Sequence, residues 1–282
     1  MKGLCDLHTH SVFSDGTCTP TEIVDEAVAL GLSAVALCDH NAVDGLDELL
    51  RAAVGKPIEA VCGAEFSVDY EGVELHLLGL YIDPRHFGRI DSVMQVVSER
   101  KAQSNRAMLE SLRRAGYALD YDAVCASTPN GKVNRAHVAT ALTEAGYTAS
   151  EKEAFDTLLS PEAGHYVEPQ RLTVWEMLGL LRDIGAVPVL AHPFLNLDEA
   201  RLRAFLPLAK AHGLCGMEVL YSKYDAETAA LAADMAQQYS LLPSGGSDYH
   251  GTRKQGIALG VGRGNLRIPY AWAEALREKR LP

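Results

Sequence analysis

The chain has 282 residues, of which 48% are hydrophobic and 22% are charged, and this is the composition of an ordinary globular protein with a sizeable core. Its formal charge of −11 and its aromatic content of 7% argue against a broad surface for long nucleic acids. We find no run of about 18 apolar residues, no secretory signal and no Cys-x-x-Cys spacing, so we expect a cytoplasmic protein without a membrane span.

Strand and helix patterns alternate in the first part of the chain and again in its last part. Thr19 is expected to cap a helix whose first residue is Pro20 and which ends at Gly31. The short apolar runs that we expect to form buried strands are 3–7, 33–38, 58–62, 73–80, 186–190, 214–220 and 241–242. Seven strands alternating with helices predict a parallel α/β barrel.

The pattern between these two parts is helical throughout. Residues 90–115 predict one long helix that ends at Gly116, and Asn134 and Ser150 are expected to cap two further helices. We therefore predict a barrel formed by residues 1–85 and 171–282, with residues 86–170 inserted as a helical cap.

Metal-binding residue types recur where the predicted strands end. His8 and His10 are two positions apart in a strand, so their rings point to the same side. In α/β barrels the chemistry gathers at the carboxyl ends of the strands. The candidates at or just beyond such ends are His8, His10, His40, Glu65, His192, Asp248 and His250, with His76 inside the fourth strand and Asp15 in the loop after the first.

These six histidines and three carboxylates exceed what one cation needs, because a zinc or manganese ion takes about three to five such ligands. We expect two or three divalent metal ions with at least one bridging carboxylate. The nitrogen and oxygen ligands suit Mn²⁺, Fe²⁺ and Zn²⁺, and we favour Mn²⁺. Unrelated hydrogen-bonded polar residues at loop starts are the alternative. Three bound divalent cations would bring the formal charge to −5, so phosphate would bind at a metal-loaded pocket rather than across the surface.

Six segments resemble, in chain order, the motifs of the polymerase-and-histidinol-phosphatase (PHP) family: Asp6-x-His8-x-His10, Asp39-His40, Gly63-x-Glu65, His76, Ala191-His192-Pro193 and Gly246-Ser247-Asp248-x-His250. The resemblance implies a distorted (β/α)7 barrel with three metals. It assigns the first metal to His8, His10, Glu65 and Asp248, the second to Glu65, His76 and His192, and the third to Asp15, His40 and His250. Many members have histidine where this chain has Asp15.

That carboxylate and the helical insertion resemble one subgroup, which contains nucleoside 3′,5′-bisphosphate phosphatases, 5′-end exoribonucleases and cyclic-phosphate phosphodiesterases. The chemistry implied is attack of a metal-activated water on phosphorus, with Glu65, Asp248 and His192 as the catalytic ligands. Our first candidate is a phosphodiesterase that converts 5-phosphoribosyl 1,2-cyclic phosphate to ribose 5-phosphate and phosphate. The alternatives are a 3′,5′-nucleoside bisphosphate phosphatase, a 5′-3′ exoribonuclease, or a non-catalytic metal-stabilised module. We expect a small phosphate ester as partner, and nucleic acid only as short or terminal nucleotides.

The residues expected to bind substrate rest on weaker signals. Arg135 resembles the phosphate-binding arginine of the subgroup, with Asn134 beside it, and Lys223 could meet a second phosphate. The alternative for Arg135 is a residue of the first helical turn that faces solvent, and the alternative for Lys223 is ordinary surface charge. Asp6 is expected either to orient a ligand imidazole or to be a satisfied acid in its strand. We read His137 as a general acid or a packed residue, and Arg171, Arg253 and Lys254 as surface charge.

Overall fold

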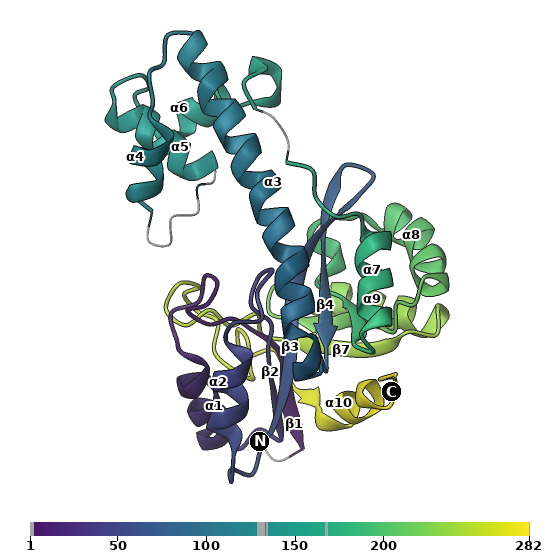
Figure 1. Cartoon of the computed structure of the whole chain (residues 1–282). Helices are drawn as coiled ribbons and strands as arrows, with labels where there is room; N and C mark the ends of the chain where they lie inside the picture. The colour runs from purple at the N-terminus through teal and green to yellow at the C-terminus, as the bar shows by residue number, and fades with distance from the viewer. Residues whose placement is uncertain (1–2, 129–132, 134, 167–168, 282) are drawn as a thin grey trace. The chain divides into compact units, whose positions relative to one another are not determined.

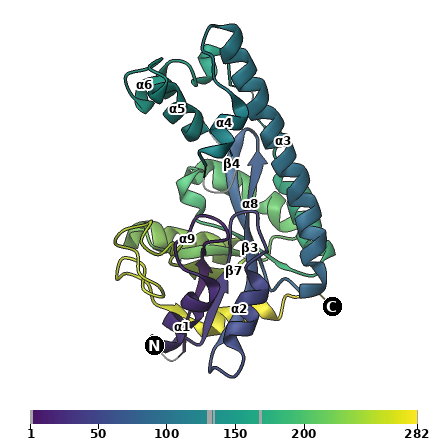
Figure 2. The same ribbon diagram turned by 60° about the vertical axis from the view of Figure 1, so that its left-hand side comes forward.

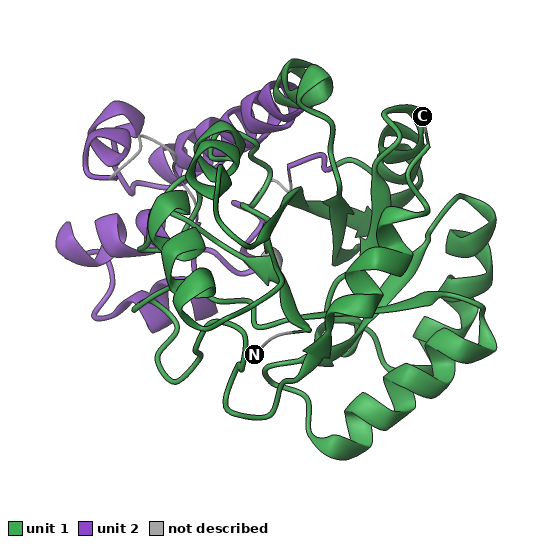
Figure 3. Ribbon diagram, turned by 90° about the horizontal axis from the view of Figure 1, so that it is seen from below, with its two compact units in different colours: residues 1–92, 172–282 green, residues 93–171 purple. Residues whose placement is uncertain are grey.

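The computed structural model describes residues 3–128, 133, 135–166 and 169–281. The chain forms two compact units, one of residues 1–92 with 172–282 and the other of residues 93–171 (Figure 3). The first is an α/β unit, and the second is helical. Among the described helices, none is both long and apolar enough to cross a membrane.

The α/β unit is built on a sheet that nearly closes into a barrel. Its strand order, within the described residues, is β7-β6-β5-β4-β3-β2-β1-β8. The strands are β1 Leu4–Thr9, β2 Ala34–Leu37, β3 Glu59–Tyr70, β4 Val73–Leu80, β5 Val187–Leu190, β6 Gly216–Tyr221, β7 Leu242–Gly246 and β8 Ile268–Pro269. Thr9 bridges Tyr249, which follows β7, and the His10 N–H donates to the Tyr249 carbonyl at 2.8 Å. The predicted barrel class is therefore confirmed.

The sheet is not wholly parallel, and our prediction was wrong in that detail. β4 runs antiparallel to both β3 and β5, and β8 runs antiparallel to β1. Only the residues Glu71 and Gly72 separate β3 from β4, both with positive φ, and so short a turn can join only antiparallel strands. β3 also continues to Tyr70, eight residues beyond the predicted end at Cys62.

Helices of the same unit surround the strands (Figures 1 and 3). They are α1 Pro20–Ala29, α2 Leu46–Ala53, α7 Val174–Asp183, α8 Glu199–Ala211, α9 Ala226–Gln238 and α10 Tyr270–Arg277, with the short 3₁₀ turns η1 Pro84–His86 and η3 Pro193–Leu195. Figures 1 and 2 both show α1 beside α2. Thr19 and Thr173 form capping boxes with Glu22 and Glu176, so local hydrogen bonds define where α1 and α7 begin.

The core of the barrel leads directly to its polar end. Val61 in β3 and Leu78 and Leu80 in β4 belong to one buried apolar cluster. Because side chains alternate along a strand, Glu65 lies on the same face as Val61, and His76 lies on the same face as Leu78. The strands that bury the core therefore also carry these polar side chains to the barrel interior.

The helical unit contains most of α3, Phe87–Arg114, which begins in the α/β unit. Its other elements are α4 Tyr121–Ala126, α5 Arg135–Glu144, α6 Glu151–Asp156 and η2 Pro161–Ala163. It has its own apolar core, which includes Met108, Leu112, Val138 and Leu142. That this unit acts as a cap over the site stays a prediction.

Candidate metal centre

The structure brings the nine predicted ligands together from six strands of the barrel and the loops that follow them. They are His8 in β1, His10 and Asp15 after it, His40 after β2, Glu65 in β3, His76 in β4, His192 after β5, and Asp248 and His250 after β7. Our prediction placed Glu65 at a strand end, but it lies within β3 because that strand runs on to Tyr70.

Glu65 is at the middle of this cluster and is fully buried. Its Oε1 lies 2.7 Å from His76 Nδ1 and 2.9 Å from His192 Nε2. Its Oε2 faces a second group of ring nitrogens at 3.0–3.3 Å, those of His8, His10 and His40. The two oxygens of one carboxylate thus face different sets of imidazoles, which is the arrangement that a carboxylate bridging two cations requires.

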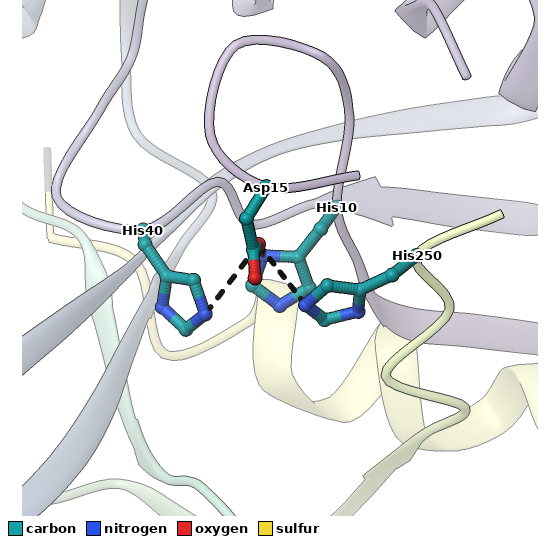
Figure 4. A group of neighbouring side chains, drawn as sticks. All are labelled: His10, Asp15, His40 and His250. Atoms are coloured by element: carbon teal, nitrogen blue, oxygen red, sulfur yellow. Dashed lines mark ion pairs between the residues drawn. The ribbon is translucent and has the colours of Figure 1, made fainter. Parts of the chain in front are cut away.

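A second group surrounds Asp15. Figure 4 shows this side chain between His40 and His250, with His10 behind it. Asp15 Oδ1 lies 3.1 Å from His250 Nε2, 3.8 Å from His40 Nε2 and 4.0 Å from His10 Nδ1. The loop that carries Asp15 is held by Asp39, which accepts hydrogen bonds from the hydroxyls of Ser11 and Ser14.

Asp248 divides its two oxygens between the cluster and two other side chains. Oδ1 lies 3.3 Å from His10 Nε2 and 3.4 Å from His250 Nδ1. Oδ2 accepts hydrogen bonds from the Tyr221 hydroxyl at 2.9 Å and from Lys254 Nζ at 2.6 Å. Lys254 is therefore part of the site rather than ordinary surface charge, and we missed it because nothing in the local pattern links it to Asp248.

Gly246 explains how β7 can approach β1 at this point. A Cβ at position 246 would overlap the Cβ of His8, so a larger residue would push the two strands apart. Asp6 strengthens the same junction, because it accepts hydrogen bonds from the backbone N–H groups of Ser247 at 2.9 Å and Gly260 at 2.8 Å. Of the two roles expected for Asp6, these contacts favour the satisfied strand acid.

Several buried polar atoms of these residues have no hydrogen-bond partner, and this shows whether the residues fit metal ions. Buried polar atoms in proteins almost always have a partner. Nine buried side-chain nitrogen or oxygen atoms among the described residues have none, and seven of them belong to the predicted ligands. They are His8 Nε2, both ring nitrogens of His10, Asp15 Oδ1, Glu65 Oε2, His192 Nδ1 and His250 Nε2. Unpartnered imidazole nitrogens and carboxylate oxygens that converge are a suitable donor set for divalent cations.

The charges of the site also suit cations. Burial would raise the pKa of Glu65, but the imidazoles of His8 and His76 lower it well below its usual value. Burial lowers the pKa of His40 to about 4, so its ring is neutral at pH 7 and has a lone pair to offer. Burial opposes protonation of His76 as well, yet the carboxylate of Glu65 raises its pKa to about 10. A metal ion would replace that proton.

The predicted substrate-binding residues are found in different places. Arg135 begins α5 in the helical unit, and its guanidinium lies 4.3 Å from the ring centre of Tyr166 and 5.9 Å from that of Phe155. Asn134 lies outside the described residues. Lys223 is exposed in the turn after β6, with no hydrogen bond or ion pair to a described residue.

Arg135 lines a pocket of about 280 Å³ in the helical unit. Its lining includes Lys101, Asn105, Arg135, Phe155, Tyr166 and Arg171. Arg171, which we expected to be surface charge, and Lys101, which no sequence pattern indicated, line the same pocket as Arg135. They bring further positive charge to it. The acidic chain concentrates three cationic side chains here.

Known proteins resemble this chain over most of its length. The PHP domain family matches residues 6–171. A 5′-3′ exoribonuclease from Haemophilus influenzae is 32% identical over 87% of this chain and 89% of its own. A 3′,5′-nucleoside bisphosphate phosphatase from Chromobacterium violaceum is 30% identical over 90% of each chain. A phosphoribosyl 1,2-cyclic phosphate 1,2-diphosphodiesterase from Eggerthella lenta is 28% identical over 87% of this chain and 94% of its own.

A solved structure agrees with these relatives. It is an amidohydrolase from Chromobacterium violaceum with bound sulfate and no metal, with a TM-score of 0.74, 29% identity, and coverage of 98% of this chain and 97% of that one. The family match spans more than half of the residues, and two relatives reach 30% identity over nearly the whole length. The chain therefore belongs to the PHP domain family.

Proposed function

We propose that this chain is a metal-dependent hydrolase that releases phosphate from a ribose carrying two phosphoryl groups. Membership of the PHP domain family, with relatives named as phosphatase, phosphodiesterase and exoribonuclease, makes it a hydrolase of phosphoesters. The observation that carries the metal dependence is Glu65, whose two oxygens face separate sets of ring nitrogens. Two of these nitrogens, Nε2 of His8 and Nε2 of His10, have no hydrogen-bond partner.

The contacts among the nine predicted ligands divide them into groups, each of which would hold one of the expected cations. Oε1 of Glu65 lies with His76 and His192, and Oε2 lies with His8, His10 and Asp248 nearby. Ligand atoms of His10, Asp15, His40 and His250 lie within 4.8 Å of one another and would hold a further cation. When bound, such ions lower the pKa of a water molecule and neutralise charge on a phosphoryl group. We favour Mn²⁺ at these nitrogen and oxygen sites.

The protein's own residues supply position and charge. Glu65 and Asp248 have lowered pKa values despite their burial, because neighbouring imidazoles stabilise the carboxylates, and they remain ionised at neutral pH. Lys254 and Tyr221 hold Asp248 Oδ2, which leaves Oδ1 directed to the cluster. Arg135, with Asn134 next to it in the chain, is our proposed contact for the second phosphoryl group, because a guanidinium can bind phosphate with two parallel hydrogen bonds.

Two substrates fit this description, and we rank them differently from the sequence alone. A 3′,5′-bisphosphonucleoside, free or at the end of a short RNA, is now the first candidate. It is supported by two relatives at 30–32% identity and by the aromatic rings of Phe155 and Tyr166 in the basic pocket. 5-Phosphoribosyl 1,2-cyclic phosphate, our earlier preference, becomes the second candidate, supported by a relative at 28% identity.

The test is phosphate release by the full chain reconstituted with Mn²⁺. Adenosine 3′,5′-bisphosphate, 5-phosphoribosyl 1,2-cyclic phosphate and a 5′-phosphorylated trinucleotide would be compared at equal concentrations, with the Glu65→Gln variant as the inactive control. We expect the bisphosphonucleoside to be hydrolysed with the highest kcat/KM. Preference for the cyclic compound would restore the diesterase assignment. A metal-loaded protein that hydrolyses none of the three would refute the proposed substrate class.

A further inference from the structure

Glu218 is a buried acid beside the metal centre that no sequence motif indicated. It lies in β6, inside the apolar run 214–220, and is fully buried. Its Oε1 lies 3.0 Å from His8 Nδ1, and its Oε2 accepts a hydrogen bond from the backbone N–H of His192 at 2.7 Å. The only ion pair that it makes to a described residue is the one with His8.

The contact with His8 determines which ring nitrogen can bind a cation. A neutral imidazole has one N–H and one lone pair, and a carboxylate can only accept a hydrogen bond. The proton of His8 must therefore be on Nδ1, facing Glu218, and the lone pair on Nε2. That second nitrogen lies 3.2 Å from Glu65 Oε2 and 3.8 Å from Asp248 Oδ1, and it has no hydrogen-bond partner.

The contact with His192 acts on a different ligand. His192 has φ 27° and ψ 55°, in the left-handed region that a residue with a Cβ seldom adopts. A strained backbone persists only where surrounding contacts hold it. The hydrogen bond from its N–H to Glu218 is such a contact. With the backbone in this conformation, the imidazole Nε2 of His192 lies 2.9 Å from Glu65 Oε1.

We propose that Glu218 is a positioning residue of the metal centre, which selects the metal-binding tautomer of His8 and holds the backbone of His192. One carboxylate thereby orients two ligands whose rings are stacked beside each other and whose Nε2 atoms lie at different oxygens of Glu65. This inference rests on the proposed metal sites. Carboxylates behind a ligand imidazole raise the basicity of the ring and fix its orientation, and their loss typically weakens metal binding by about 10–100-fold.

The Glu218→Gln variant tests the tautomer directly. An amide has one acceptor and one donor end, and the N–H of His192 needs the acceptor. The amide NH₂ then faces His8 Nδ1, so the proton of the ring moves to Nε2 and its lone pair no longer points to the cluster. We expect Mn²⁺ affinity at one site to fall roughly 10–100-fold, measured by titration of metal-free protein against a competing chelator. Metal analysis after desalting should show a loss of about one ion per chain.

The matched control is Glu59→Gln, at the other end of the sheet. Glu59 also accepts two side-chain hydrogen bonds, from Tyr270 at 2.8 Å and Arg277 at 3.0 Å, but it lies at the start of β3, away from the ligands. The Glu59→Gln variant should keep the metal content and the Mn²⁺ affinity of the wild-type protein. Wild-type affinity in Glu218→Gln would overturn the inference, whereas a wild-type protein that binds no divalent metal would instead overturn the proposed function.

A double-mutant cycle separates positioning from a general structural role. If Glu218 acts on affinity chiefly through His8, then Glu218→Gln in a His8→Ala background should lower Mn²⁺ affinity by less than about twofold further. An additional loss of tenfold or more would show that Glu218 acts elsewhere and would overturn the proposal. Should Glu218→Gln fold poorly by circular dichroism, Glu218→Asp is the second variant, because its carboxylate is one methylene shorter and moves away from both His8 Nδ1 and the N–H of His192. Wild-type Mn²⁺ affinity in Glu218→Asp would then overturn the proposal.

Discussion

The two units of this molecule present opposite chemistry. In the α/β unit, carboxylates and unpartnered ring nitrogens converge in a buried cluster, which is an environment for cations. In the helical unit, Lys101, Arg135 and Arg171 line one pocket with two aromatic rings, which is an environment for anions. The contrast teaches that a formal charge of −11 does not indicate whether a given region of the molecule binds cations or anions.

They also differ in construction. The ligands of the cluster are on or directly after strands, and their positions follow from sheet hydrogen bonds and a shared core. The side chains of the pocket are on helices and on the chain that follows η2, and Arg135 among them makes cation–π contacts with Tyr166 and Phe155. We therefore expect changes in the cluster to abolish turnover and changes in the pocket to affect substrate affinity.

Removal of the metals should have the largest effect. Treatment with a chelator should abolish turnover and lower the unfolding temperature of the protein, and added Mn²⁺ should restore both. At a free metal concentration 100 times the dissociation constant, binding stabilises the folded state by about 2.7 kcal/mol. Thermal melts with and without Mn²⁺ measure the shift, and Arg135→Met should show the same shift. Full activity after exhaustive chelation would contradict the assignment of the cluster.

Glu65→Gln should reduce kcat by on the order of 10³-fold or more, because the charge and one of the oxygens shared between the two sets of ligands are lost together. The far-ultraviolet circular dichroism should be unchanged, since the amide has the same shape. Glu274→Gln, on the exposed side of α10, is the control and should be fully active. Retention of wild-type kcat in Glu65→Gln would exclude a bridging role.

Arg135→Met should raise KM for the bisphosphonucleoside by about 10–100-fold and leave the metal content unchanged. A hydrogen bond to a charged group contributes about 1.5–3 kcal/mol, which corresponds to this range. Arg113→Met is the control, because Arg113 is exposed on α3 and pairs with Glu110. Equal KM values in both variants would leave the basic pocket without a role in substrate binding.

Lys254→Met should have the smallest effect, a decrease in kcat of about fivefold. Asp248 Oδ2 keeps its hydrogen bond from Tyr221, and the Lys254 side chain is 29% exposed, so water screens part of its charge. The neighbouring Arg253→Met variant should be unaffected. A loss as large as that of Glu65→Gln would mean that Lys254 contacts the substrate itself.

Much of the site could be predicted because its signals are local. His8 and His10 share a side through the two-residue period of a strand, and Thr19 and Thr173 start helices through bonds to residues three positions on. The alternation of strands and helices likewise predicted the barrel class. All nine proposed ligands, chosen from such patterns and from a family resemblance, lie in one cluster.

Other features depend on which segments meet in the folded chain. The antiparallel pairing of β4 with β5 joins residues more than 100 positions apart, and the two-residue strand β8 has no periodic pattern to detect. Lys254 reaches Asp248 across an irregular loop, and Arg171 joins Arg135 in a pocket only because the helices pack as they do. No local sequence pattern indicates that these residues contact one another.

Glu218 shows the physical reason most clearly. In the sequence it is one acid within an apolar strand, and strand periodicity specifies its face but not its neighbour. In the structure, closure of the barrel brings it to His8, 210 residues away, and to the backbone of His192. Strand periodicity and helix caps can be predicted from neighbouring residues, because they depend on side-chain alternation and on hydrogen bonds over a few positions. The partner of a buried charge is decided by packing across the sheet, which tertiary structure alone determines.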